Sequence, residues 1–356
     1  MRIFSLTLFA FILFTQNIKA QKADEEKKIP ISKQLKIEVL DSLLERLRKF
    51  YVFPDTVVKI EKAIRLYKKK GYYSNITDSK TFADTLTNQL FALAHDKHLS
   101  VSFNDESPTP YQTPIAHEED KAKTFQRFKI QKNFGFSKID ILDGNVGYLK
   151  IEAFFPVKDA AQTATAAMNY LANTDALIID LRPNHGGEPE MVQYLESYFF
   201  DTIPVHLNDL YWREGNKTIQ YWTLPNISGK RYLNKSIYIL TNTETFSAGE
   251  AFTYDLQSLK KAIVVGEPTG GGANPGSDVN LTGQFVAFIP NGRAINPITK
   301  TNWEGTGVKP DFVTSKEKTL IEAQILALKK LAETTTDKKI KDYFQKNLDK
   351  VRATLK

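Results

Sequence analysis

The chain has 356 residues, of which 42% are hydrophobic and 12% aromatic, enough to bury one large core and a smaller satellite. This composition excludes a disordered or fibrous protein, and the absence of cysteine excludes disulfides, cysteine nucleophiles and thiolate metal sites. The formal net charge of +7 comes mainly from scattered lysines, which predicts a solvated surface and no nucleic-acid partner; the alternative is a basic face that binds a partner.

Residues 1–20 have the pattern of a signal peptide. Arg2 gives a positive start, an apolar run extends from Ile3 to Phe14, and a polar segment begins after Ala20. The apolar run is shorter than the roughly 20 residues that span a membrane. We therefore expect cleavage after Ala20 and a soluble protein, periplasmic or secreted, with no stable membrane insertion. The alternative is an uncleaved anchor.

Apolar residues recur at helical spacing between residues 33 and 94. The pattern predicts helices over about 33–47, 57–67 and 79–93, the last capped by Asp78 or Ser79. Apolar and polar residues then alternate as far as Phe103, which indicates a strand. We therefore expect a linker at 21–32 and a small N-terminal helical domain at 33–105.

Residues 106–130 are rich in Pro, Glu, Asp and Thr and have no apolar period, which predicts an exposed linker. Over 131–315, short apolar strands alternate with helices, and the turn Asp143-Gly144-Asn145 indicates a hairpin. This alternation predicts an α/β layered core, followed by C-terminal helices at 316–356. The expected strands cover 134–142, 146–151, 176–181, 236–240, 262–265 and 284–289, and the expected helices 159–173, 190–199 and 248–258.

Ser247 stands where a buried strand passes through a polar turn into a helix that begins at Ala248. A nucleophile at such a place is held rigidly beside the free N–H groups of the helix start. The alternative is an ordinary N-cap serine. Thr245, two residues before the serine, rules out the G-x-S-x-G elbow of α/β-hydrolases.

Another buried strand ends in Asp180-Leu-Arg182 and a turn that contains Gly186 and Gly187. Tandem glycines allow a backbone to approach a ligand closely and to direct N–H groups at an oxyanion. The alternative is a tight strand–helix turn in which Asp180 and Arg182 form a structural ion pair.

Together these motifs resemble those of the C-terminal processing and tricorn-type serine peptidases, a family that also contains interphotoreceptor retinoid-binding protein. The resemblance covers about residues 133–311 and implies a crotonase-like core of ββα units, peptide or protein substrates, and neither metal nor cofactor. Its motifs are Gly144-Asn-Val-Gly-Tyr148-Leu, Asp180-Leu-Arg-x-Asn-x-Gly-Gly187, Thr245-x-Ser-Ala-x-Glu250, Val265-Gly-Glu-x-Thr-Gly-Gly-Gly272 and Glu304-Gly-Thr-Gly-Val-Lys-Pro-Asp311.

The resemblance also bears on the base, because the family has two branches. One branch places a lysine in the glycine-rich segment, but no lysine occurs here between Lys261 and Lys300. The tricorn-like branch uses the histidine of an Asp-x-His motif and orients it with a glutamate. His98 and Glu304 stand at the matching places, so the resemblance implies that Ser247 is the nucleophile, His98 the general base and Glu304 its orienting acid.

Each of these assignments has an alternative. His98 is otherwise a packed histidine at a strand start, with His95 as a nearby rival, and Glu304 is otherwise a loop cap. His185 occupies a position usually held by glycine in the family, and we expect it to line the cleft and influence substrate choice.

The resemblance implies that the oxyanion donors are the backbone N–H of Ala248 and that of Gly186 or Gly187. Glu250 is alternatively a helix-start acid stabilised by the helix dipole.

Only about thirty residues separate Phe103 from Asn133, whereas a PDZ domain needs about ninety. We therefore expect no recognition of a substrate's C-terminal tail by that route. The rival to an exported serine endopeptidase is a non-catalytic binding protein for a small apolar ligand on the same fold. The presence of serine, histidine and glutamate together favours the enzyme.

Overall fold

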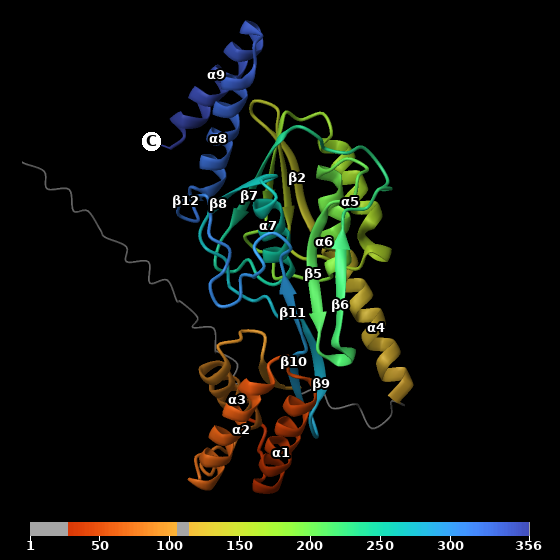
Figure 1. Cartoon of the computed structure of the whole chain (residues 1–356), viewed down its shortest axis with the longest axis vertical. Helices are drawn as coiled ribbons and strands as arrows, with labels where there is room; N and C mark the ends of the chain where they lie inside the picture. Colours follow the sequence, from red (N-terminus) through yellow and green to blue (C-terminus); the bar gives the residue numbers. More distant parts are fainter. Residues whose placement is uncertain (1–27, 105–113, 356) are drawn as a thin grey trace, which may run out of the picture.

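The computed structural model describes residues 28–104 and 114–355, so the expected signal peptide lies outside the described residues. Figure 1 shows three parts along the long axis: N-terminal helices at the bottom, an α/β core in the middle and a C-terminal helical hairpin at the top. Within the described ranges, no helix has the length and apolar character to cross a membrane.

The core is built on one six-stranded sheet, in the order β12-β8-β7-β4-β3-β2. Only the β2–β3 hairpin is antiparallel, and the other neighbours are parallel. The mixed α/β class and the predicted hairpin are thereby confirmed. The strands are β2 (Phe136–Leu142), β3 (Val146–Ile151), β4 (Ala176–Asp180), β7 (Ser236–Thr241), β8 (Ala262–Gly266) and β12 (Phe312–Val313).

Helices cover both faces of this sheet, because successive residues of the central strands point to opposite sides. Leu177 and Ile179 pack on the side of α5, α6 and α7, whereas Ala176 and Ile178 pack on the side of α8 and α9. Fully burying such side chains contributes about 1.5–3 kcal/mol each. The helices are α5 (Val157–Leu171), α6 (Pro189–Glu196), α7 (Ala248–Ser258), α8 (Thr319–Thr334) and α9 (Lys338–Ala353).

The N-terminal helices share their core with strands from the far end of the chain. The rings of Tyr73 and Phe82 meet edge to face at 5.6 Å, and Phe82 meets Phe285 at 6.0 Å. Residues near 285 therefore complete the core of this unit. Its elements are α1 (Lys33–Phe50), α2 (Pro54–Lys69), α3 (Ser79–Ala94), β1 (Ser100–Phe103), β9 (Gly276–Asn280) and β10 (Phe285–Pro290).

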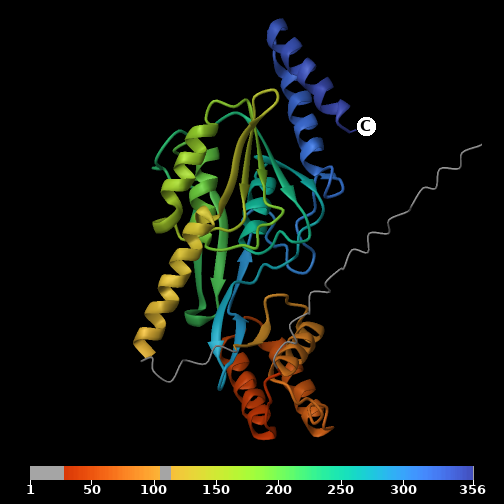
Figure 2. The ribbon, with the colours of Figure 1, turned by 180° about the vertical axis from the view of Figure 1, so that it is seen from behind.

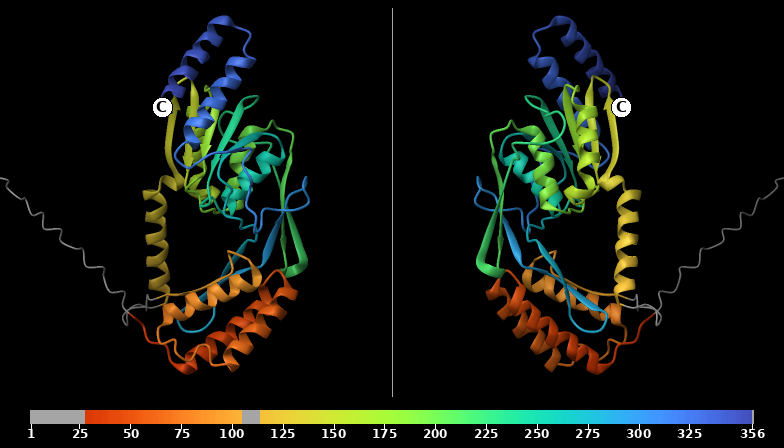
Figure 3. Two further views of the ribbon diagram at one scale, coloured as in Figure 1. Left: turned by 90° about the vertical axis from the view of Figure 1, so that its left-hand side faces the viewer. Right: turned by 90° about the vertical axis from the view of Figure 1, so that its right-hand side faces the viewer.

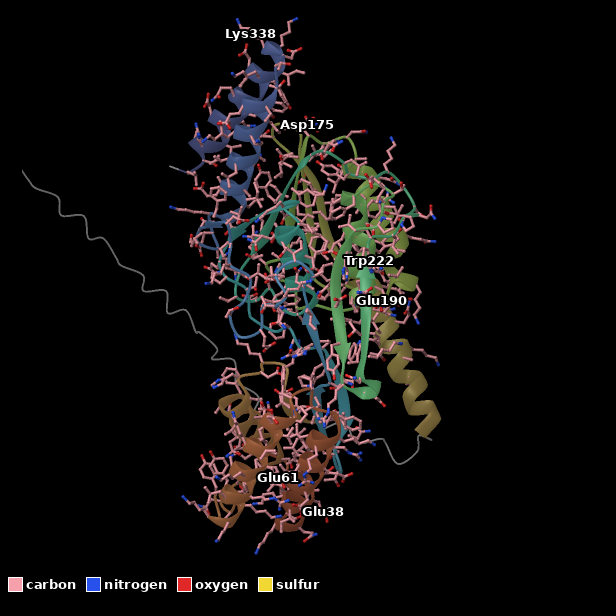
Figure 4. The ribbon with its side chains drawn as sticks, viewed as in Figure 1. Glu38, Glu61, Asp175, Glu190, Trp222 and Lys338 are labelled. Carbon is pink, nitrogen blue, oxygen red and sulfur yellow. The ribbon has the colours of Figure 1, made fainter. Side chains whose placement is uncertain are left out.

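A long ribbon connects this unit to the core. Strand β10 is followed, after Asn291 alone, by β11 (Gly292–Ile295), and β11 pairs with β5 (His206–Trp212), which pairs with β6 (Lys217–Trp222). The ribbon runs upward from the helices in Figure 1 and is seen from behind in Figure 2. In Figure 4 the labelled Glu190 and Trp222 mark where α6 meets β6; there Gln193 Nε2 donates to the carbonyl of Trp222 at 2.8 Å.

The segment expected as a linker over 106–130 is partly a helix, α4 (Pro114–Gln131), so the loop prediction is wrong from residue 114 onward. Figure 3 shows α4 running beside the molecule between its lower and middle parts. Helix α4 has no strong apolar stripe, and tertiary contacts stabilise it instead. Lys129 Nζ lies 2.5 Å from Asp159 Oδ2, and the ring of Phe128 packs on Phe155. The sequence pattern also missed the polar strands β5, β6, β9 and β11.

Candidate active site

Three loops meet at the carboxyl end of the parallel strands. Asp180, Leu240 and Val265 are register partners in β4, β7 and β8, and the carboxyl ends of parallel strands open to one edge. The loops that follow carry the glycine turn, the serine and the glycine-rich segment. Thr245 Oγ1 donates to the Leu181 carbonyl at 2.8 Å, which joins the first two loops directly.

Ser247 is the N-cap residue of α7 and has a strained backbone, with φ +53° and ψ −119°. The fold holds it there by close approach of the glycine turn. A Cβ on Gly186 would lie 2.7 Å from Ser247 Cβ and 3.0 Å from Ala248 N. Only glycine fits at 186, and the serine hydroxyl is therefore carried on a fixed, half-buried turn.

Glu250 fixes the serine turn from below. Its carboxylate accepts hydrogen bonds from the N–H groups of Ser247 (2.9 Å), Gly271 (2.6 Å) and Gly272 (2.8 Å), and from Thr269 Oγ1 (2.5 Å). Burial raises the pKa of Glu250, against the opposing effect of these donors. Glu250 is thus an acid in the first turn of α7, as one interpretation of the sequence had it. The same side chain links the serine loop to the glycine-rich loop.

Two free N–H groups lie beside Ser247. The Gly186 N–H donates to Asn184 Oδ1 at 2.9 Å, so it is already engaged. Among the hydrogen bonds of the described residues, the N–H groups of Gly187 and Ala248 have no acceptor. Of the two glycines considered from sequence, Gly187 is therefore the one available to stabilise an oxyanion.

His98 lies against aromatic rings at the start of β1. Its imidazole packs on Phe246 with centroids 4.5 Å apart and on Phe288 at 5.9 Å. Its Nδ1 is buried without a hydrogen-bond partner, and burial lowers the pKa of His98 to about 4. The imidazole is consequently neutral at pH 7. No hydrogen bond among the described residues joins it to Ser247.

Glu304 and Asp96 lie next to the imidazole. A ring nitrogen of His98 and one carboxylate oxygen from each of Asp96 and Glu304 all lie within 4.8 Å of one another. Glu304 Oε2 accepts from the Ala273 N–H at 2.6 Å, whereas Oε1 is buried without a partner. Burial, followed by the charge of Asp96, raises the pKa of Glu304 to about 8.

Asp96 is well supplied with donors: Tyr51 Oη and Asn274 Nδ2, each at 3.1 Å from Oδ2, and the His98 N–H at 3.0 Å from Oδ1. It holds the loop that carries the imidazole. Asp96, His98 and Glu304 are also the one group among the described residues whose spacing suits a divalent cation.

The glycine-rich segment bridges the serine side and the histidine side. The Gly272 N–H donates to Glu250, and the next N–H, that of Ala273, donates to Glu304. A Cβ on Gly272 would lie 2.7 Å from His98 Cε1, and Lys97 Nζ donates to the Gly270 carbonyl at 2.5 Å. Four consecutive residues thus bring the two halves of the site together.

The other sequence candidates differ in their placement. His185 directly precedes Gly186 in the turn beside Ser247; its side chain is exposed and is not among those that line the pocket beside the serine, and its influence on substrate choice stays a prediction. His95 is exposed at the C-cap of α3. Asp180 and Arg182 form a two-bonded ion pair (2.6 and 2.8 Å), which Tyr148 Oη joins at 2.7 Å. The structural interpretation of that pair is therefore confirmed.

A small pocket with a cavity volume of about 80 Å³ opens beside Ser247 between α6, α7 and β5. Two of its lining residues, Glu196 and Asp255, are buried acids that the sequence analysis missed. Each sits within a helix pattern that accounts for its neighbours, so no sequence signal distinguished it from a solvated acid.

Two models of known protein families match this sequence. The profile of Peptidase family S41 matches residues 145–314, and that of the N-terminal domain of Peptidase_S41 in eukaryotic IRBP matches residues 24–138. The chain belongs to peptidase family S41. Peptidases of this family act on protein or peptide substrates. The N-terminal match agrees with the resemblance to the family that contains interphotoreceptor retinoid-binding protein.

A curated relative and several solved structures extend the comparison. The chain is 26% identical over 213 residues to carboxyl-terminal-processing peptidase 2, chloroplastic, of Arabidopsis thaliana. The match covers 56% of this chain and 38% of that relative, so the chain spans well under half of the relative's length.

Among solved structures, mature CPAF is similar with a TM-score of 0.54 at 13% identity, covering 89% of this chain and 96% of that one. A protein of Parabacteroides merdae described as a candidate peptidase has a TM-score of 0.55 at 18% identity, covering 82% and 95%. These similarities concern the fold.

Proposed function

We propose that this chain is an exported serine endopeptidase in which Ser247 attacks the scissile carbonyl. The observation that carries the proposal is the strained serine turn with two free N–H groups, those of Gly187 and Ala248, beside it. The serine proton passes to His98, and the carbonyl oxygen becomes an oxyanion that accepts from these two groups.

In the second step the tetrahedral intermediate breaks its C–N bond, and His98 returns the proton to the leaving amine. Water then attacks the acyl-enzyme through the same base and releases the acid. Glu304 acts as the orienting group: its carboxylate accepts from His98 Nδ1–H, so that Nε2 is free to take the serine proton. The contact between Ser247 and His98 tightens when substrate binds, as is common for catalytic hydrogen bonds in free enzymes.

The proposal also includes the type of α/β core and the place where the protein acts. We infer a crotonase-like core in which β2, β3 and α5 make one ββα unit, beside a small N-terminal helical domain. The charge and apolar pattern of residues 1–20 support export to the periplasm or the medium. N-terminal sequencing of the protein recovered from cell fractions tests that location, with Gln21 as the expected first residue.

Fluorophosphonate labelling tests the activated serine. The protein from Gln21 onward should label, Ser247→Ala should abolish labelling, and His98→Ala should reduce it strongly. Ser258→Ala, at the other end of α7, is the matched control and should label as the wild type does. Absence of labelling in folded wild-type protein would contradict the proposal.

The second candidate function is binding of a small apolar ligand. The mainly apolar lining of the pocket beside Ser247 favours it. Lipid extraction and mass spectrometry of the purified protein would reveal a co-purified ligand, and a ligand retained equally by Ser247→Ala would support binding without catalysis.

A further inference from the structure

The pocket beside Ser247 leads along one face of α7. Ser247, Ala251 and Asp255 recur every four residues and all line it, so they lie on the same side of the helix. Eight residues of helix correspond to about 12 Å. Ala251, which has a small side chain, lines the pocket between the serine and Asp255. The pocket thus runs from the nucleophile to a buried carboxyl group.

Helix α6 supplies the second acid. Val192 and Glu196 are also four residues apart and line the pocket from the facing helix. Glu196 is 0% exposed and Asp255 1% exposed, and the two carboxyl groups lie close enough that the charge of Asp255 acts on Glu196. Apolar side chains form most of the remaining wall: Leu207, Leu210, Tyr221, Ala294 and Trp303.

Four buried oxygen atoms around this pair lack a hydrogen-bond partner. Both carboxyl oxygens of Glu196, Oδ2 of Asp255 and Oδ1 of Asn208 are buried without a hydrogen-bond partner. Asp255 Oδ1 is satisfied by Asn296 Nδ2 at 3.0 Å. An apolar substrate side chain would leave all four acceptors unpaired, whereas an ammonium or guanidinium group brings three to five N–H donors. The site therefore lacks a cationic donor.

We propose that this pocket is the subsite for the residue before the scissile bond and that it takes a lysine or arginine side chain, whose charged end binds Glu196 and Asp255. This inference rests on the proposed peptidase function of Ser247. It names the substrate class: peptides cleaved after a basic residue. A long aliphatic stem packs on the apolar wall while the charge reaches the acids, as basic side chains do elsewhere.

Burial raises the pKa values of both acids in the empty pocket. A bound cation favours their ionised forms, so the pair releases protons when a basic side chain enters. The apolar wall and the buried acids then act together. An uncharged side chain of the same length gains the wall contacts alone.

The test compares two peptide substrates that differ only before the scissile bond, one with lysine and one with the uncharged isostere norleucine. We expect kcat/KM at least 30-fold higher for lysine. Glu196→Gln and Asp255→Asn should each reduce that ratio at least tenfold while norleucine cleavage continues. Glu244→Gln removes an exposed carboxylate paired with Lys316 and should leave the ratio unchanged. A ratio near one in the wild type, or one unaltered in both pocket variants, would overturn the inference.

Two further measurements separate this inference from the peptidase proposal. Fluorophosphonate labelling with preferred norleucine cleavage would leave the peptidase intact and reject the basic subsite. Benzamidine, a cationic probe, should bind the Ser247→Ala protein by calorimetry and lose at least tenfold in affinity in the Ser247→Ala, Glu196→Gln double variant. Failure of that binding would reject the subsite whatever the serine does, and the thermal midpoint of each variant shows that it is folded.

Discussion

The two halves of the site are built in opposite ways. On the serine side, Glu250 takes four hydrogen bonds and Asn184 ties the glycine turn to the strand ends. On the histidine side, His98 Nδ1 and Glu304 Oε1 are buried without partners, although the two residues lie close to one another. Hydrogen bonds therefore fix the position of the serine turn, whereas no hydrogen bond fixes the protons of His98 and Glu304. The rigid part of the site and the part that changes its protonation lie on different loops.

The largest effect should come from the serine itself. Ser247→Ala should lower kcat by roughly 10⁴-fold or more, because no other group can form the acyl bond. Steady-state cleavage of a fluorogenic peptide measures it, with Ser258→Ala as the control. Residual activity within tenfold of the wild type would mean that the fixed side does not carry the nucleophile.

The histidine side should split into two effects. His98→Ala should cost nearly as much as Ser247→Ala, whereas Glu304→Gln should cost about 10²- to 10⁴-fold, because an amide no longer favours the productive tautomer. In the wild type, kcat/KM should rise with pH as Glu304 ionises near pH 8. Glu304→Gln should lose that rise. A rise of the same size in both proteins would remove Glu304 from the mechanism.

The anchoring role of Glu250 predicts a mixed loss of stability and rate. Glu250→Gln replaces one acceptor oxygen with an NH₂ group that faces backbone donors, so we expect a loss of about 2–4 kcal/mol in the free energy of unfolding. Slower fluorophosphonate labelling should accompany it. Urea denaturation measures the loss, and Glu244→Gln should remain within about 0.5 kcal/mol of the wild type. An unchanged urea midpoint would show that the fixed side does not depend on this carboxylate.

The histidine side also predicts how stability depends on pH. The pKa of Glu304 is raised from 4.5 to about 8, so the folded protein keeps a proton that the unfolded chain releases, and stability falls as pH rises through that window. The pKa of His98 is lowered from 6.5 to about 4, so its contribution is lost as pH falls from 6.5 to 4. Between pH 6.5 and pH 8 the His98 contribution is constant, so the urea midpoints of Glu304→Gln at these two pH values should differ less than those of the wild type. An equal difference would contradict the assignment.

The smallest expected effect is that of a chelator. Asp96, His98 and Glu304 have spacing that suits a cation, yet the proposed proton relay needs no metal. Overnight dialysis against EDTA should leave peptide cleavage and the thermal midpoint unchanged. Activity lost on dialysis and restored by one divalent ion would instead make these three residues a metal centre.

The sequence predicted the parts of the site that follow strong local patterns. Ser247 follows a buried strand and begins a helix, and the tandem glycines follow the neighbouring strand, so parallel pairing alone brings them together. The placement of His98 beside Glu304 needed the family resemblance. No local pattern shows that β1 pairs with β10 across most of the chain.

The errors have equally specific causes. Helix α4 lacks an apolar stripe and depends on tertiary contacts such as Lys129 with Asp159. The strands β5 and β6 carry polar residues on their outer faces, so period-two alternation was obscured. Glu196 and Asp255 could not be found because the burial of an acid depends on packing between distant elements.

The pairing of β1 with β10 also fixes when the enzyme can first act. Ser100 is aligned with Phe288, and Glu304 follows later still. A nascent chain emerges from its N-terminus and domains fold as they appear, so Ser247 is synthesised before the ribbon that positions His98. A ribosome-bound fragment that ends soon after Ser247 therefore contains His98 but lacks the strand β10 that pairs with β1. We therefore expect the proposed set of Ser247, His98 and Glu304 to assemble only after residue 304 has been added to the chain.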